Sequence, residues 1–283
     1  VLYHGHCFDG FSSAAIFTRF YRECVDATAT FEYQGMRHGS PDPIDVTLLD
    51  GDVNALVDFR YSPSPRLDWW WDHHRSAFVT DEERAHFDAT PNPHHHWDST
   101  APSCAGYLAR TCAEEHGFDT GPLAELIKWA DVIDAARYPD ARTAVALEAP
   151  AMKLAAICEG LGDGPDAVAL IEDLAGGSLA ALVDKRQWVE RFAPIKASQA
   201  EGLQLVRERL EVFGDVIFID LTGQSGVAVN KFASYFLAPE ATYVVMVSSL
   251  PAGVKLSVGS NPWRPEARRH DLSEICERFG GGG

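Results

Sequence analysis

The chain has 283 residues, of which 46% are hydrophobic and 23% charged, a composition typical of a soluble globular protein with two domains. Its net charge of −17 disfavours binding along a long nucleic acid, which needs a basic surface, but leaves open a short phosphorylated substrate held by cations. No apolar run approaches the roughly 20 residues of a membrane helix, and no signal segment opens the chain.

The cysteines are scattered and form no CxxC pair; they are Cys7, Cys24, Cys104, Cys112, Cys158 and Cys276. This spacing disfavours a disulfide framework and predicts reduced thiols. We therefore expect a cytoplasmic protein that does not bind membranes.

The first predicted elements are a short strand over residues 1–3 and a helix over residues 11–21. The loop between them contains glycine and several side chains that can bind metals, namely His4, His6, Cys7 and Asp9. A strand, a glycine-containing loop and a helix N-terminus together form a general anion-binding arrangement. The loop is therefore predicted to bind a metal or a phosphate, and an ordinary polar loop is the alternative.

Three β-rich runs follow, over residues 29–33, 46–49 and 55–59. Asp50 comes directly after the second run, and Asp58 lies near the end of the third. An acid at the carboxyl end of a strand is where a carboxylate that bridges two metal ions would lie. The two residues compete for that role, and we favour Asp58.

Trp69–Trp71 are predicted to form a buried strand that ends in Asp72, His73 and His74. Ligands of open α/β sheets collect at the carboxyl ends of the strands. These three polar residues can supply a metal ligand, a residue that orients it and a proton donor. Alone, the tripeptide would suggest surface histidines at a capped strand; the preceding candidates favour the metal site.

Two helices are predicted next, over residues 103–116 and 123–136. Asp131 and Asp134 lie three residues apart near the end of the second helix and share a side of it.

The run His94–His96, which precedes these helices, cannot direct all three side chains at one metal from a regular element. A solvated loop is favoured there, with a ligand or a substrate contact as alternatives.

Residues 141–211 have a mainly helical pattern broken by glycines, and residues 178–211 suit a connector between domains. A second α/β unit begins near residue 215. Its predicted elements are a strand over 216–220, a helix over 226–237, two strands over 242–248 and 253–257 that could pair as a hairpin, and a helix over 271–279.

The terminal glycines Gly280, Gly281, Gly282 and Gly283 leave backbone N–H groups free to approach a phosphate, although such a run is equally typical of a flexible end. Arg264, Arg268 and Arg269 are nearby cations. They are candidates for binding substrate, and a solvated basic loop is the alternative.

Five segments together resemble the DHH phosphoesterases that carry a DHH-associated C-terminal domain: HGHCFDGFSSA, LVDFRYSP, WWWDHHRSAF, KWADVID and ERFGGGG, in that order. This superfamily includes RecJ-like exonucleases, oligoribonucleases that also dephosphorylate phosphoadenosine phosphate, cyclic-dinucleotide phosphodiesterases and family II pyrophosphatases. The resemblance implies an α/β protein with a parallel-sheet DHH catalytic domain (1–160), a helical connector (161–212) and a smaller α/β substrate-binding domain (213–283). The active site is expected in the cleft between the domains.

The resemblance also implies a centre of one or two Mn²⁺ ions, with Mg²⁺ as a substitute. It assigns Asp58 to both ions, Asp9, His73 and Asp131 to one ion, and His4 to the other. Asp72 is expected to orient His73, and His74 to contact the phosphate or protonate the leaving group. Asp50 and Asp134 are the alternative acids. Arg264 and the glycines of 280–283 are expected to bind substrate.

The chain departs from the family pattern at Cys7, where an acid is usual, and in the spacing from His4 to Asp9. The second ion is then weakly bound, reorganised around His6, or absent. We predict a hydrolase that acts on short single-stranded oligonucleotides or small nucleotide phosphoesters by metal-activated water, with Phe8 and Trp97 as candidates for stacking a base. The alternatives are a cyclic-dinucleotide phosphodiesterase and a nucleotide-binding regulatory protein with a degenerate metal site. A homodimer is compatible with the sequence.

Overall fold

The computed structural model describes residues 1–37, 44–224, 227–250 and 253–280. The chain divides into two compact units. The first is Val1–Arg137 with Ala149–Val189, and the second is Tyr138–Glu148 with Glu190–Gly283. The α/β class is confirmed, because one sheet is parallel and a smaller sheet is mixed. The division into functional domains at residues 160 and 212 stays a prediction.

The first unit is built on a five-stranded parallel sheet of order β2-β1-β3-β4-β5. Its strands are β1 (Leu2–His4), β2 (Gln34–Met36), β3 (Ala55–Val57), β4 (Trp69–Asp72) and β5 (His95–Trp97). From β1 the chain goes to β2 on one side and then returns to β3 on the other. In such sheets, ligands bind beyond the carboxyl ends of the two strands where the direction reverses, which here are β1 and β3.

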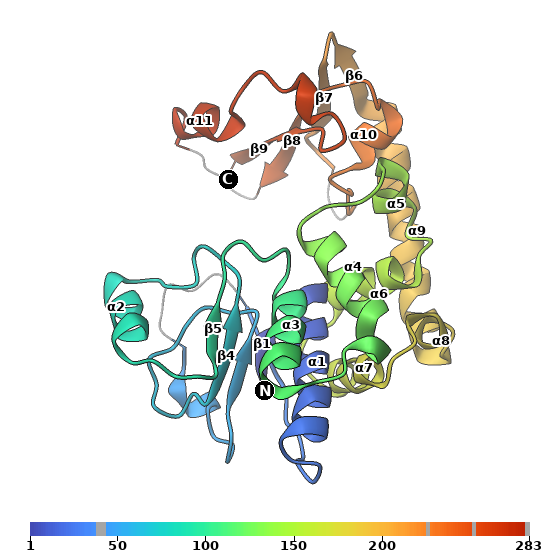
Figure 1. Ribbon diagram of the computed structural model, residues 1–283. Helices are drawn as coiled ribbons and strands as arrows, with labels where there is room; N and C mark the ends of the chain where they lie inside the picture. The colour runs from blue at the N-terminus through green and yellow to red at the C-terminus, as the bar shows by residue number, and fades with distance from the viewer. Residues whose placement is uncertain (38–43, 225–226, 251–252, 281–283) are drawn as a thin grey trace. The chain divides into compact units, whose positions relative to one another are not determined.

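Helices cover both faces of this sheet (Figure 1), with α1 and α3 on one side and α2 on the other. The helices of the unit are α1 (Phe8–Cys24), α2 (Asp81–Ala89), α3 (Cys104–His116), α4 (Ala124–Asp134), α6 (Pro150–Gly160), α7 (Pro165–Gly176) and α8 (Leu179–Val183), with short 3-10 turns at Val46–Leu48 and Gly121–Leu123. The helix α9 (Arg186–Arg209) runs from the first unit into the second. Within the described ranges, we find no helix long and apolar enough to span a membrane.

The tryptophans of β4 are buried on both faces of the sheet, because successive side chains of a strand point in opposite directions. Trp70 packs against Phe78 and Phe87, and its indole Nε1–H donates to the Phe59 carbonyl at 2.9 Å. Trp71 lies on the opposite face, where its Nε1–H donates to Thr111 Oγ1 at 2.8 Å. Each indole therefore fills core volume without leaving a buried donor unpaired.

The second unit has a four-stranded sheet of order β6-β7-β8-β9. Its elements are α5 (Ala141–Ala146), β6 (Leu210–Phe213), β7 (Val216–Leu221), α10 (Ala233–Leu237), β8 (Tyr243–Leu250), β9 (Gly253–Ser260), a 3-10 turn (Pro265–Ala267) and α11 (Leu272–Glu277). The predicted hairpin is present, since β8 and β9 are antiparallel neighbours. The early segment 138–148 is joined to this unit by hydrogen bonds from Asn230 Nδ2 to the Ala144 carbonyl and from Trp263 Nε1 to the Tyr138 carbonyl.

Two predicted strands are wrong. Residues 46–48 form a 3-10 turn, because the Asp45 carboxylate accepts from the backbone N–H and hydroxyl of Thr47 and fixes a turn in place of an extended backbone. Residues 29–33 are not a strand. The strand begins at Gln34, which lies opposite Leu2 where β1 begins.

Two helix boundaries and one predicted loop also differ from the predictions. The first helix begins at Phe8 and not at Phe11, so Asp9 lies in its first turn. The helix predicted from residue 226 begins at Ala233, and residues 225–226 lie outside the described part. The solvated loop favoured for His94–His96 is wrong, since His95 and His96 belong to β5 and their neighbour His94 stacks on the Trp69 ring with the centroids 3.8 Å apart.

Gly10 allows α1 to pass directly over the end of β1. A Cβ atom at this position would lie 2.0 Å from the His4 carbonyl oxygen, which is backbone and cannot rotate away. We expect Gly10→Ala to lower the free energy of unfolding by about 1 to 3 kcal/mol through this overlap. Gly160→Ala is the matched control, because a Cβ at the end of α6 has nothing within 4 Å. Equal urea midpoints for the two variants would contradict this account of α1 packing.

Candidate metal centre

The ends of β1, β3 and β4 and the starts of their following segments bring most of the predicted ligands together. Three groups of side chains have one ligand atom each within 4.8 Å of the others: His4, Cys7 and Asp58; Asp58, His73 and His74; and Asp9, His73 and Asp134. Asp58 and His73 each belong to two groups, so the three groups form one continuous centre. All of these residues lie in the first unit.

His73 directs its Nε2 atom into this centre. Its Nδ1 lies 3.1 Å from the Ala101 carbonyl, which can only accept, so Nδ1 carries the proton. Nε2 is buried without a hydrogen-bond partner and lies 3.6 Å from Asp9, 3.6 Å from Asp58 and 3.3 Å from Asp134. A ring nitrogen among three carboxylates needs a positive charge beside them, which a proton or a metal ion can supply. Ligands of an octahedral Mg²⁺-sized ion are about 3 Å apart, which is close to the distances found.

The Asp9 carboxylate is fixed by the start of α3. The backbone N–H groups of Cys104 and Ala105 donate to its two oxygens at 2.7 and 2.9 Å, and the N-terminus of a helix favours a negative charge. These hydrogen bonds do not offset burial and the nearby Asp134, which together raise the pKa of Asp9 to about 6. The metal-free site therefore contains more negative charge than its surroundings stabilise.

Asp58 follows β3 in a left-handed backbone conformation, with φ of +55°. Its N–H donates to the Trp71 carbonyl at 2.9 Å, which ties it to β4. Burial and the carboxylates of Asp9, Asp72 and Asp134 raise its pKa well above the usual range of an aspartate. A strained backbone that holds a buried charge near like charges is typical of a functional site.

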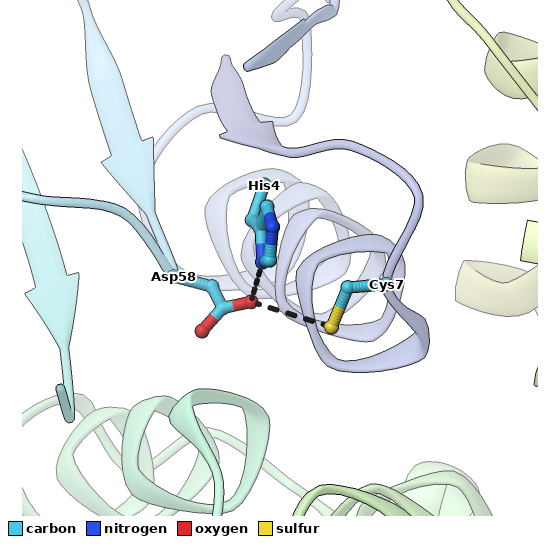
Figure 2. Close-up of side chains that lie close together, drawn as sticks. All are labelled: His4, Cys7 and Asp58. Atoms are coloured by element: carbon cyan, nitrogen blue, oxygen red, sulfur yellow. Dashed lines mark hydrogen bonds and ion pairs between the residues drawn. The ribbon is translucent and has the colours of Figure 1, made fainter. Parts of the chain in front are cut away.

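Figure 2 shows the group formed by His4, Cys7 and Asp58, whose side chains converge from the end of β1, the start of α1 and the end of β3. The Asp58 Oδ2 atom lies 3.3 Å from His4 Nδ1 and 3.8 Å from Cys7 Sγ. Burial, followed by the carboxylates of Asp58 and Asp9, raises the pKa of the Cys7 thiol. Without a metal, Cys7 is therefore a protonated thiol that donates to Asp58.

Asp72 is paired with His74, whereas the family resemblance assigned it to orient His73. Its Oδ1 atom lies 2.7 Å from His74 Nδ1 and accepts from the backbone N–H of His73 at 2.8 Å. The hydrogen bond to Asp72 raises the pKa of His74. The Trp97 Nε1–H donates to the His74 carbonyl at 2.8 Å, so β5 also helps to hold this residue. His74 is thus suited to donate a proton or to contact an anion.

The structure places Asp134, and not Asp131, beside His73. Asp131 accepts a hydrogen bond from Ser103 Oγ at 2.6 Å and is not in the three groups. The two acids share a side of α4 but differ by about 4.5 Å along its axis, so only one of them is level with the metal centre. This geometry favours Asp134, the alternative acid of the sequence analysis, as the candidate ligand, and the choice between the two acids stays a prediction.

The remaining candidates lie apart from the three groups. Asp50 is exposed and lies outside the three groups, whereas Asp58 belongs to two of them; the bridging role expected of Asp58 stays a prediction. His6 has a φ of +64°, and its Nδ1 lies 3.3 Å from the Glu159 carbonyl on α6. Phe8 is 3% exposed and belongs to the core, which leaves no face for a base to stack on.

The predicted substrate-binding residues belong to the second unit. Arg264 donates to the Glu240 carbonyl and lies 3.4 Å from the Glu240 carboxylate. Gly280 is exposed with φ of +75°. Gly281, Gly282 and Gly283 lie outside the described residues. Their predicted roles stay predictions.

Three backbone atoms that hold the ligand side chains in place cannot be recognised from a sequence motif. The Ala101 carbonyl and the N–H groups of Cys104 and Ala105 act through the backbone, so their residue types give no signal. Ser103 could have been noticed as a helix N-cap, and it does cap α3 by accepting from Gly106 N–H. Its second role, as a donor to Asp131, needs the structure.

No family model matches the chain, and no curated protein matches it. Among solved structures, it is similar to PggH, a pGpG-specific phosphodiesterase from Vibrio cholerae, with a TM-score of 0.71 and 18% identity over 100% of this chain and 89% of that one. It is also similar to the DHH domain of a member of the S1p family of ribosomal proteins, with a TM-score of 0.59 and 12% identity over 99% of this chain and 80% of that one. The chain therefore shares the fold of these two structures, one of which is named as a DHH domain.

Proposed function

We propose that this protein is a metal-dependent phosphoesterase that hydrolyses short single-stranded oligonucleotides or small nucleotide phosphoesters. The observation that carries this proposal is the buried His73 Nε2 atom, which faces three carboxylates within 3.6 Å. Nitrogen and carboxylate donors without sulfur suit Mn²⁺ or Mg²⁺. The similarity in fold to a structure named as a phosphodiesterase supports the same class of reaction.

Asp9, Asp58, His73 and Asp134 would hold the ion of this group. When bound, divalent ions act as Lewis acids toward a phosphoryl oxygen and lower the pKa of water to near neutrality. His74, held at Nδ1 by Asp72 and with a raised pKa, would contact the phosphate or protonate the leaving oxygen. Asp58 contributes a carboxylate whose two oxygens face different groups of ligands, which suits a residue shared by two ions.

A short substrate is favoured over a long one. The net charge of −17 opposes the approach of a long polyanion, while a few local cations suffice for one or two phosphates. The Vibrio cholerae protein is named for pGpG, a linear dinucleotide, which is within the proposed size class. A cyclic-dinucleotide phosphodiesterase and a nucleotide-binding regulatory protein that lost hydrolysis are the alternatives.

A substrate panel tests the proposal directly. We expect Mn²⁺-stimulated hydrolysis of pGpG and of other dinucleotides or phosphoadenosine phosphate, and complete loss of activity with a chelator. Rates are measured side by side on these substrates, pyrophosphate, a cyclic dinucleotide and a long single strand. Fastest turnover of pyrophosphate or of the long strand would contradict the proposed substrate class. Tight nucleotide binding without turnover would favour the regulatory alternative.

The choice of acid on α4 can be tested with a matched pair. We expect Asp134→Asn to weaken Mn²⁺ binding by at least about 10- to 100-fold, because the acid beside His73 Nε2 loses its charge. Asp131→Asn should keep Mn²⁺ affinity and lower the free energy of unfolding by about 1 to 2 kcal/mol through its bond with Ser103. Calorimetric titration and urea unfolding of both variants decide the matter. The reverse pattern would restore Asp131 as the ligand.

Asp58→Asn should separate stability from metal binding. The raised pKa means that the folded, metal-free protein gains stability from this group at acidic pH and loses it as the pH rises through the folded value. At pH 7.5 without metal, we expect the variant to be more stable than the original chain by about 1 to 2 kcal/mol. This gain should shrink as the pH falls toward 3.8, the ordinary value for aspartate.

The same variant should lose Mn²⁺ binding and hydrolysis. Asparagine also tolerates the left-handed backbone at this position, so the comparison is not confused by backbone strain. A metal-free variant that is less stable than the original chain at pH 7.5 would show that Asp58 is not in a charge conflict.

A further inference from the structure

We propose that Cys7 is a metal ligand and that it makes one of two ion positions selective for a thiophilic ion such as Zn²⁺, Co²⁺ or Fe²⁺. The other position, built from Asp9, His73 and Asp134, would keep Mn²⁺ or Mg²⁺. This inference rests on the metal centre of the proposed function and adds to it that the two positions hold chemically different ions. In this view Cys7 determines which metal enters, where the sequence alone suggested a weakened or absent site.

Two distances from Asp58 Oδ2 are close to those of a tetrahedral site. Ligand bonds of about 2.0 Å to nitrogen or oxygen and about 2.3 Å to sulfur place nitrogen and oxygen about 3.3 Å apart and sulfur and oxygen about 3.5 Å apart. The structure has 3.3 Å from His4 Nδ1 to Asp58 Oδ2 and 3.8 Å from Cys7 Sγ to the same oxygen (Figure 2). An ion could therefore bind with only small side-chain movements.

The Asp58 carboxylate shows where the two positions meet. Its Oδ2 atom lies with His4 and Cys7, whereas its Oδ1 atom lies 3.6 Å from His73 Nε2. Asp58 is 1% exposed, and Oδ1 is buried without a hydrogen-bond partner in the described structure. A buried acid with one oxygen toward each donor set is an independent sign that both positions bind cations.

The backbone holds the thiol in place without using it for another purpose. Cys7 is the residue before α1, where serine, threonine, asparagine or aspartate usually cap the helix, yet its side chain makes no capping hydrogen bond. The preceding residue His6 has a φ of +64°, which turns the chain sharply between His4 and Cys7. The thiol is thus directed at Asp58 and not at the N–H groups of the helix.

Donor chemistry then separates the two positions. Sulfur favours Zn²⁺ and other borderline ions, while carboxylates favour Mn²⁺ and Mg²⁺. The thiol must lose its proton when the ion binds, so one bond from sulfur to the metal replaces the S–H bond and one proton passes to the solvent. Metal binding at Cys7 should therefore release a proton and produce the charge-transfer absorption of a metal–thiolate bond.

Cobalt titration of the metal-free chain tests the inference. We expect one equivalent of Co²⁺ to produce the near-ultraviolet charge-transfer band of a thiolate ligand. Cys7→Ser should abolish this band and weaken Zn²⁺ binding at least tenfold. Cys24→Ser and Cys276→Ser are the controls, because Cys24 is exposed on α1 and Cys276 belongs to none of the three groups of ligands. Both controls should keep the band.

A competition experiment measures the selectivity itself. Because Zn²⁺ binds most nitrogen and oxygen sites more tightly than Mn²⁺, the dialysis uses Mn²⁺ in large excess over Zn²⁺. We expect elemental analysis to find one Zn²⁺ and one Mn²⁺ per chain, and a lower share of Zn²⁺ in Cys7→Asp. A band that is absent in the original chain or that persists in Cys7→Ser would overturn the inference, as would an unchanged metal ratio in Cys7→Asp. Retained Mn²⁺ binding in Cys7→Ser would show that the variant is folded.

The two proposals fail in different ways. Hydrolysis with Mn²⁺ in a chain that shows no thiolate band would leave the phosphoesterase proposal standing and remove the role of Cys7. A Cys7-dependent band in a chain that hydrolyses no member of the substrate panel would support the metal-binding role of Cys7 and contradict the phosphoesterase proposal.

Discussion

The crowding of His73 Nε2 with three carboxylates, of which those of Asp9 and Asp58 are buried, is the constraint on which the metal centre depends. Left to itself, such a cluster would spread apart or take up protons, and the raised pKa values of Asp9 and Asp58 show the second tendency. The fold resists spreading because each ligand is tied to a different rigid element: Asp9 to the start of α3, Asp58 to the end of β4 and His73 to the Ala101 carbonyl.

The surrounding core explains how the sheet tolerates this conflict. β4 carries three buried tryptophans whose ring contacts extend to both faces, so the strand that delivers Asp72, His73 and His74 is among the most firmly packed parts of the chain. The Trp71 carbonyl oxygen accepts two hydrogen bonds, from the Asp58 N–H and from the Cys104 thiol. It therefore joins β3, β4 and α3 at the edge of the site. Packing energy spread over many apolar contacts can hold a small group of unfavourable charges in place.

Much of this arrangement follows from local sequence patterns. The buried strand before Asp72, the helix that ends near Asp134 and the acid after β3 are each visible as apolar runs that meet a polar residue. The details that fail depend on hydrogen bonds and helix packing that the pattern of apolar residues does not show. Asp45 turns residues 46–48 out of a strand through a bond to Thr47, and only the packing of α4 against α3 decides that Asp131 meets Ser103 while Asp134 meets His73.

The partner of Asp72 is a similar case. Adjacent histidines offer the carboxylate two imidazoles at nearly equal reach, and the sequence does not tell which ring it will hold. In the structure the Ala101 carbonyl already holds His73, so Asp72 holds His74. Backbone partners of this kind leave no trace in residue type, which is why ligand identities are easier to predict than the atoms that orient them.

The path of the chain between its two units affects how the protein could be divided genetically. The crossings fall after Arg137, Glu148 and Val189, so the second unit is assembled from an internal segment as well as from the C-terminal stretch. A fragment that starts at residue 190 would lack Tyr138 and Ala144, whose carbonyls accept from Trp263 and Asn230. Two buried or half-buried donors would lose their acceptors, at a cost of about 1 to 3 kcal/mol each. Independent expression of this unit would therefore need a permuted gene in which residues 138–148 are joined to the later segment.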